Sequence, residues 1–278
     1  MALEVLLSGT VQAQSVLDRY LDYLESPTLR WGPLVLTACF LAAFVAFALK
    51  SAIYGRPHTT RIEKAGGSIL LSKYVMEYGL WVFSPLTRTA IHLGIHPDFF
   101  SWTSLVLQLG AALLIAAGYF GLGAWVLILG AFCDALDGAV ARARGIASDA
   151  GEVLDAAMDR WAELAVFFGY AWYYRSQGWA FLLACAACAG AMMVSYSRAK
   201  GESFGIDASM GLMQRHERAT WLAVATLGSA MWELWRPTPV GEFAYHTPVL
   251  FALGMIGALG NWTAWIRTQY TRQELRKR

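Results

Sequence analysis

Four aspartates at helical spacing are the residues of this sequence best suited to chemistry. Asp134 and Asp137 lie three positions apart, and Asp155 and Asp159 lie four apart. Residues at these spacings share one face of a helix, so two helices joined by residues 143–150 could direct all four carboxylates into one cleft. Carboxylates held close together repel one another unless a cation lies between them, and hard divalent cations prefer oxygen ligands. The spacing therefore predicts a site for one or two divalent cations.

Small residues and an arginine accompany the aspartates. Gly138 and Ala141 follow the first pair, and Gly151 lies one helical turn before Asp155. Because these residues lack bulky side chains, a ligand could approach the helix backbone there, and Arg142 adds a planar cation that suits a phosphate group. Together these features predict a pyrophosphate substrate. The alternative is an ion-pair network that only holds two helices together, in which the aspartates are neutralised by Arg142, Arg144 and Arg160.

Long apolar runs must position this motif. The chain has 278 residues, of which 57% are hydrophobic and 15% are charged, and this composition is too apolar for an ordinary soluble domain. Because a membrane span needs ~20 residues, the runs and their polar ends predict about seven transmembrane helices. The candidate spans lie at 33–49, 101–120, 121–133, 161–174, 179–194, 219–235 and 247–265. The prediction is an all-α integral membrane protein, with a six-helix transmembrane bundle and an extra N-terminal transmembrane helix.

The segment before the bundle has a mixed character. Residues 68–92 combine apolar residues with Lys73, Glu77 and Arg88. This pattern predicts an amphipathic juxtamembrane helix that lies on the inner membrane surface. The alternative is a tilted span that is broken at Pro85.

The sequence predicts no second soluble domain. Residues 1–67 would comprise an outer-face segment with a short amphipathic helix at residues 12–30, then the extra transmembrane helix and a cytoplasmic connector. Residues 68–278 would form the membrane domain. Three glycines on one face of the last span are expected to pack inside the bundle, with a homodimer seam as the alternative: Gly254, Gly257 and Gly260.

The positive charges are unevenly distributed. Lys and Arg gather in the segments on the motif side, whereas the opposite side carries Arg19, Arg30, Arg175 and Arg236. By the positive-inside rule, the motif is predicted to face the cytoplasm and the N-terminus to lie outside, in a bacterial-type inner membrane. The expected partners are the lipid bilayer and small-molecule substrates, and no nucleic acid.

The full motif, D-x2-D-G-x2-A-R-x8-G-x3-D-x3-D, resembles the signature of the CDP-alcohol phosphotransferase (phosphatidyltransferase) family at all eight positions. The resemblance covers roughly residues 85–270. Members are integral membrane enzymes with a six-helix bundle, which move a phospho-alcohol from a CDP-alcohol to a hydroxyl acceptor and release CMP. The resemblance implies Mg²⁺ or Mn²⁺, two ions, with Asp134, Asp137 and Asp155 as the main ligands. Asp159 would complete the metal site or act as the general base.

The resemblance also implies a CDP pocket, lined by Gly138, Ala141, Arg142 and Gly151. Family members often carry a Pro-Asn-x-x-Thr stretch at the start of the first bundle helix. Here the stretch reads Pro97-Asp98-Phe99-Phe100-Ser101, in which Asp and Ser are departures and Ser101 is the candidate CDP contact.

A basic cluster where two spans meet the cytoplasm could grip a phosphorylated acceptor. It resembles the Ser-Tyr-x-Lys-Ala-Arg-Ala-Glu and Glu-Arg-x-x-Arg stretches of bacterial phosphatidylinositol phosphate synthases, whose cations bind the phosphate of inositol phosphate. The implied acceptor-phosphate ligands are Arg198, Lys200, Arg215, Arg218 and, on the last span, Arg267. The alternative is ordinary positive-inside charge, with Glu202 and Glu217 as surface partners.

The sequence thus predicts a phospholipid-synthesising transferase that moves a phosphatidyl group from CDP-diacylglycerol to a polar alcohol, first of all inositol phosphate. Glycerol 3-phosphate and free inositol are the alternative acceptors. Diacylglycerol accepting from CDP-choline or CDP-ethanolamine would leave the basic cluster without an acceptor phosphate. An ion-coupled transporter is a more distant alternative, because such proteins often show repeated halves with broken helices and this sequence shows no such repeat.

Overall fold

The structure is a computed structural model that describes residues 27–55, 73–146, 148–239 and 242–278. Within these ranges all regular secondary structure is helical, which confirms the predicted all-α class. The outer-face helix expected at residues 12–30 lies outside the described residues up to position 26. The connector expected after the first span lies outside them from residue 56 onward.

The chain divides into two compact units, Met1–Ala43 and Phe44–Arg278. Helix α2, Pro27–Tyr54, begins in the first unit and ends in the second. The part Trp31–Tyr54 is long and apolar enough to cross a membrane, in agreement with the first predicted span. Within the second unit, the ring of Phe47 on α2 packs against the ring of Trp81, with centroids 5.4 Å apart.

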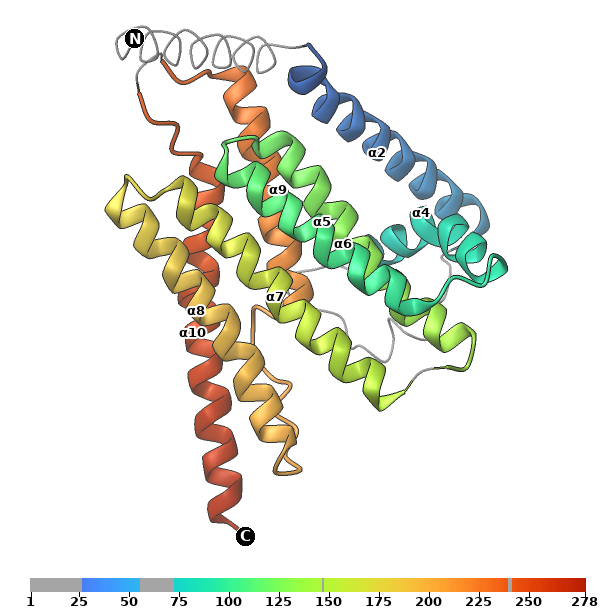
Figure 1. Cartoon of the computed structure of the whole chain (residues 1–278), viewed down its shortest axis with the longest axis vertical. Helices are drawn as coiled ribbons and strands as arrows, with labels where there is room; N and C mark the ends of the chain where they lie inside the picture. The colour runs from blue at the N-terminus through green and yellow to red at the C-terminus, as the bar shows by residue number, and fades with distance from the viewer. Residues whose placement is uncertain (1–26, 56–72, 147, 240–241) are drawn as a thin grey trace, which may run out of the picture. The chain divides into compact units, whose positions relative to one another are not determined.

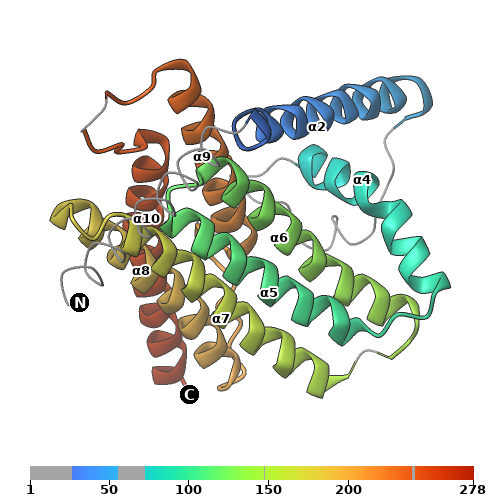
Figure 2. The same cartoon turned by 45° about the horizontal axis from the view of Figure 1, so that its top comes forward.

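The second unit continues with seven helices in the described ranges: α4 (Lys73–His92), α5 (Pro97–Ala116), α6 (Phe120–Ala143), α7 (Asp149–Tyr173), α8 (Gly178–Glu202), α9 (Arg215–Trp235) and α10 (Thr247–Arg276). Packing contacts run from α5 to α6, then to α9, α10, α8 and α7, and return to α5. Figures 1 and 2 both show α5, α6 and α7 side by side and α8 lying along α10. Helix α4 packs against α6.

Small residues allow α8 and α10 to approach closely. A Cβ atom added to Gly260 would lie 3.2 Å from the carbonyl carbon of Gly190, and one added to Gly257 would lie 3.3 Å from the nitrogen of Ala187. Gly254 faces α8 as well, with Leu183 3.8 Å from its added Cβ. All three glycines of the last span therefore serve packing between these two helices, as the sequence predicted.

Five of the described helices are long and apolar enough to cross a membrane, in agreement with the predicted integral membrane protein: α2, α5, α6, α8 and α10. Helices α7 and α9 do not meet this criterion; both carry charged residues of the motif and basic cluster near their first turns. Helix α4 does not meet it either, and it continues through Pro85 rather than breaking there.

The helices around the aspartates extend beyond the apolar runs as far as the connection predicted at residues 143–150. The span predicted at 121–133 continues to Ala143, and the span predicted at 161–174 begins at Asp149. A tight turn joins them: Gly145 adopts a φ of 67°, and the Ser148 hydroxyl caps α7 by accepting a hydrogen bond from the Gly151 amide at 3.2 Å. The motif therefore occupies the last turns of α6 and the first turns of α7.

Candidate active site

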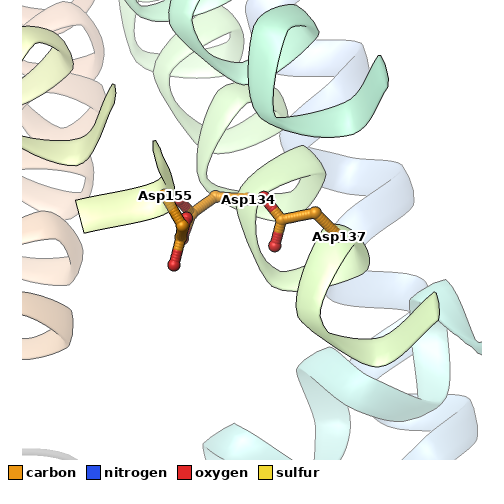
Figure 3. A group of neighbouring side chains, drawn as sticks. All are labelled: Asp134, Asp137 and Asp155. Carbon is orange, nitrogen blue, oxygen red and sulfur yellow. The ribbon is translucent and has the colours of Figure 1, made fainter. Parts of the chain in front are cut away.

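Three aspartates converge where α6 ends and α7 begins. Oxygen atoms of Asp134, Asp137 and Asp155 all lie within 4.8 Å of one another, and Figure 3 shows the three carboxylates gathered together. This aspartate triad forms because Asp134 and Asp137 share a face of α6, while the antiparallel α7 presents Asp155 to that face. Three carboxylate oxygens at this separation are hard donors that suit Mg²⁺ or Mn²⁺, so the donor set fits the predicted cation.

A serine on a third helix holds one member of the triad. The Ser101 hydroxyl of α5 donates to Asp137 Oδ2 at 2.7 Å, and both residues are buried. The second oxygen, Oδ1, accepts from the backbone N–H of Gly138, so hydrogen bonds to both oxygens restrict the rotation of this carboxylate. Ser101, predicted as a CDP contact, therefore also orients Asp137.

An open cleft of about 630 Å³ lies beside the triad. Its volume is within the range of small-molecule sites. It is lined by Asp137 and Asp155 and by the complete set predicted to bind CDP: Ser101, Gly138, Ala141, Arg142 and Gly151. Further polar side chains line it as well: His96, Asp98, Ser148, Asp149 and Glu152. The structure thus brings the predicted nucleotide residues together in one cavity.

Arg142 supplies a positively charged side chain to this cleft. Its side chain is exposed and makes no ion pair with the part of the chain that the structure describes. Gly138 leaves room for it, because a Cβ at that position would lie 2.9 Å from Arg142 Nη1. Arg144, by contrast, donates to the carbonyl oxygens of Gly94 and Ile95, both at 3.0 Å, and so ties the α4–α5 link to the end of α6.

Asp159 lies outside the triad and is held by arginines. It forms an ion pair with Arg215 of α9 and a second one, at 3.8 Å, with Arg160. Arg215 also grips Asp134, donating from Nη1 to Oδ2 at 3.1 Å and from Nη2 to Oδ1 at 2.9 Å. The structure therefore groups three of the four predicted metal ligands. The fourth, Asp159, is linked to Asp134 through the guanidinium of Arg215.

The predicted acceptor-phosphate residues have different environments. Arg215 contacts the aspartates, as described above. Arg198 and Lys200 are exposed: Arg198 Nε lies 2.9 Å from Glu202 Oε1, and Lys200 Nζ lies 4.8 Å from the centre of the Phe204 ring. Arg218 and Arg267 are fully buried. The structure therefore does not place the five cations on one common surface.

The two buried arginines fix the segment 203–214 that leads into α9. Arg267 donates to three carbonyl oxygens, those of Met210, Val194 and Ser209, at 2.6, 3.0 and 3.1 Å. Arg218 Nη1 donates to the Met213 carbonyl at 2.6 Å. Met213 has a φ of 59°, a left-handed backbone conformation that L side chains rarely adopt, and this bond helps to hold it there.

Glu163 is a site residue that the sequence analysis missed. Its carboxylate accepts hydrogen bonds from Nε and Nη2 of Arg218, at 2.7 and 3.0 Å. Arg160 Nη1 lies 3.3 Å from its Oε2. Arg160 in turn donates to the hydroxyl of Ser195 on α8. Glu163 lies four residues after Asp159 in an apolar run, and this spacing is the signal that could have found it.

The comparison with known protein families identifies one family. The family model for CDP-alcohol phosphatidyltransferase matches residues 94–266, which contain the triad, the cleft and all the predicted acceptor-phosphate residues except Arg267. The chain is 34% identical over 141 residues to a phosphatidylinositol phosphate synthase of Cutibacterium acnes, covering 49% of this chain and 68% of that protein. It is also 34% identical over 177 residues to the synthase of the same name from Streptomyces avermitilis, covering 62% of this chain and 70% of the relative.

Solved structures share the fold. The crystal structure of Mycobacterium tuberculosis phosphatidylinositol phosphate synthase with CDP-DAG bound aligns with a TM-score of 0.58 at 23% identity, over 68% of this chain and 93% of that one. The same protein in complex with manganese and citrate aligns with a TM-score of 0.58 at 24% identity, over 67% of this chain and 87% of that one.

Proposed function

Because the chain belongs to the CDP-alcohol phosphatidyltransferase family, we propose that it moves the phosphatidyl group of CDP-diacylglycerol to a hydroxyl of inositol phosphate and releases CMP. One observation carries this proposal: the aspartate triad opens onto a cleft that contains the small residues and the arginine suited to a nucleotide pyrophosphate. The names of the relatives favour inositol phosphate as the acceptor.

The triad would hold the divalent cations, Mg²⁺ or Mn²⁺, as a pair of ions. Asp134, Asp137 and Asp155 would be the ligands, and Ser101 would keep Asp137 in its ligating orientation. When bound, such cations neutralise the pyrophosphate and stabilise the negative charge on the departing CMP.

The cleft would bind the CDP group. Gly138, Ala141 and Gly151 would let it lie close to the backbone of α6 and α7, and Arg142 would contact a phosphate oxygen through its planar guanidinium. Within the described residues Arg142 has no ion-pair partner, which supports this role.

Asp159 would act as the general base. It would take the proton of the acceptor hydroxyl, whose oxygen would then bond to the β-phosphorus while the bond to the bridging oxygen breaks and CMP leaves. Removing a proton from an alcohol near neutral pH is uphill at ~1.4 kcal/mol for each pK unit, so the surrounding positive charge must offset several kcal/mol. One observation supports the assignment over a ligand role: Asp159 lies outside the triad.

Arg215 would be the main contact of the acceptor phosphate. It lies beside both Asp134 and Asp159, whereas Arg198 and Lys200 are exposed at the end of α8 and could add to it. Arg218 and Arg267 are saturated by Glu163 and by backbone carbonyls, so they would act by fixing the segment before Arg215. Glycerol 3-phosphate presents the same phosphate group and is the second candidate acceptor.

We further propose that α5 to α10 form a six-helix transmembrane bundle, within a membrane domain of residues 68–278. The closed sequence of contacts among these helices supports this arrangement, with α2 as an additional span and α4 as a surface helix. The aspartate end would face the cytoplasm and the N-terminus the outside. Exposed tryptophans at the opposite helix ends would mark the outer interface: Trp172, Trp179, Trp232 and Trp235.

A direct assay tests the proposed reaction. Purified protein in detergent would receive radiolabelled CDP-diacylglycerol and Mg²⁺ with inositol phosphate, inositol, glycerol 3-phosphate or serine in parallel. We expect CMP release and a new phospholipid with inositol phosphate. A product with glycerol 3-phosphate instead would change the acceptor, and no CMP release with any of them would reject the transferase.

A further inference from the structure

Arg215 occupies carboxylate oxygens that the divalent cation would need. Its two terminal nitrogens reach both oxygens of Asp134, at 3.1 and 2.9 Å, and it also pairs with Asp159. Asp134 therefore belongs to two groups at once: it is a member of the aspartate triad and the bidentate partner of an arginine. No such arginine contact is recorded for Asp137 or Asp155 within the described residues.

We propose that Arg215 is the built-in counter-ion of the metal-free site and that a divalent cation displaces it from Asp134. A guanidinium and a metal ion on the same carboxylate repel each other, and a partly buried site screens this repulsion less than water does. Binding of the metal therefore releases the guanidinium from Asp134. When the metal is removed, the guanidinium pairs with Asp134 again.

The local structure lets the side chain move while the backbone stays in place. Arg215 is the first residue of α9, and its side chain is 36% exposed. Directly before it, the backbone N–H of Gln214 donates to Glu217 Oε2 at 2.9 Å, as part of a capping box. Three residues after it, Arg218 is buried and anchored to Glu163. These contacts hold the first turn of α9, so that the exchange requires only rotation of the Arg215 side chain.

The exchange couples the metal to the acceptor, and this step rests on the proposed function. A released Arg215 can pair with the acceptor phosphate, whereas an Arg215 held by two aspartates cannot do so without losing them. Metal binding thus creates the acceptor site, and linkage requires the phosphate to tighten metal binding by the same factor. The protein accordingly binds the metal before the acceptor.

Metal affinity tests the competition directly. We would titrate the full-length purified protein with Mn²⁺ and follow free Mn²⁺ by electron paramagnetic resonance. Arg215→Gln should bind Mn²⁺ roughly tenfold more tightly than the unaltered protein, because one competing positive charge is gone. Arg175→Gln, which removes the same charge at the opposite end of α7, is the matched control and should change nothing. An affinity of Arg215→Gln that is equal or weaker would overturn the proposal, since Arg215 would then support the metal rather than compete with it.

A second measurement uses the unaltered protein and does not depend on folding of a variant. Phenylglyoxal modifies accessible guanidinium groups, and the rate at each arginine can be read by peptide mass spectrometry. We expect Arg215 to react several-fold faster with Mg²⁺ present than after chelation, while Arg175 reacts at the same rate in both. An unchanged or slower reaction at Arg215 would overturn the exchange. Neither readout requires turnover, so a failed exchange and a failed transferase assay are distinguishable.

Discussion

The carboxylate of Glu163 accepts hydrogen bonds from two nitrogens of Arg218, at 2.7 and 3.0 Å, and this ion pair joins α7 to α9 inside the bundle. The Arg218 side chain is 1% exposed and that of Glu163 is 12% exposed. Removing one member of a buried ion pair leaves the other charge without compensation, which costs several kcal/mol. The pair is therefore part of the support for the first turn of α9, from which Arg215 reaches the aspartates.

Glu163→Gln should lower the thermal stability of the protein. We expect a loss of about 3 kcal/mol, because Arg218 stays buried while its charged partner is gone. The midpoint of thermal unfolding in detergent measures the effect. Glu202→Gln is the control, since it breaks the exposed pair with Arg198 and should cost under ~1 kcal/mol. Equal shifts of the unfolding midpoint in the two variants would show that the Glu163–Arg218 pair contributes no more to stability than the exposed Glu202–Arg198 pair.

Ser101→Ala should weaken metal binding with little loss of stability. The hydroxyl donates to Asp137 Oδ2 at 2.7 Å, and a hydrogen bond to a charged group contributes about 1.5–3 kcal/mol, so the Mn²⁺ affinity should fall roughly tenfold or more. Ser104→Ala is the matched control: Ser104 is buried on the same helix, but its hydroxyl donates to the Gly130 carbonyl at 2.9 Å. Unchanged metal affinity in Ser101→Ala would remove its role in orienting Asp137.

Asp159→Asn should abolish turnover while CDP-diacylglycerol still binds. The amide keeps the shape of the side chain but cannot accept a proton, and a general base contributes about 10²–10⁴-fold to a rate. CMP release and equilibrium binding of the CDP-lipid would be measured on the same preparation. Asp207→Asn, an exposed substitution in the segment before α9, serves as the control. Near-normal turnover in Asp159→Asn would eliminate this residue as the base.

His246 should make the protein less stable in acid. It lies in the link before α10, and burial against the rings of Phe120 and Tyr173 lowers its pKa to about 4, although the charge of Glu233 acts in the opposite direction. Its ordinary pKa is 6.5, so the unfolded chain binds a proton that the folded protein excludes between these values. Stability contributed by neutral His246 is therefore present above pH 6.5 and is lost as the pH falls toward 4.

The pH dependence of thermal unfolding checks this prediction. His246 has a φ of 47°, so asparagine, which tolerates that conformation, is the suitable replacement. Between pH 7 and 4.5 the unfolding midpoint of His246→Asn should fall less than that of the unaltered protein. A variant of the exposed His92 should follow the unaltered protein. Parallel curves for the unaltered protein and both variants would contradict a half-buried, neutral His246.

The triad and the cleft were predictable because they depend on local order. Asp134 and Asp137 share a face through helical periodicity, and the short turn at Gly145 brings Asp155 back to it. The all-α class followed from the apolar runs in the same way. The apolar runs stop short of the turn, but the spacing of the aspartates placed the connection at residues 143–150, and α6 and α7 do end and begin there, at Ala143 and Asp149.

The arginine contacts were not predictable because they depend on how distant helices meet. Arg215 reaches Asp134 across 81 positions of sequence, and Arg267 reaches the Met210 carbonyl across 57. A sequence shows that an arginine lies near a helix end, but not that a folded segment will place carbonyl oxygens around it. The position of Glu163, four residues after Asp159, is a local signal, but its pairing with Arg218 of another helix cannot be read from the sequence.

Metal dependence of CMP release tests the central claim most directly: that Asp134, Asp137 and Asp155 bind the cations that neutralise the pyrophosphate. The protein would be treated with EDTA, dialysed, and supplied with CDP-diacylglycerol and inositol phosphate, with Mg²⁺ absent or restored, beside Asp155→Asn. We predict no CMP release without metal, recovery when Mg²⁺ returns, and a loss of at least roughly 100-fold in Asp155→Asn at any Mg²⁺ concentration. Normal turnover by the chelated protein, or by Asp155→Asn, would contradict the account.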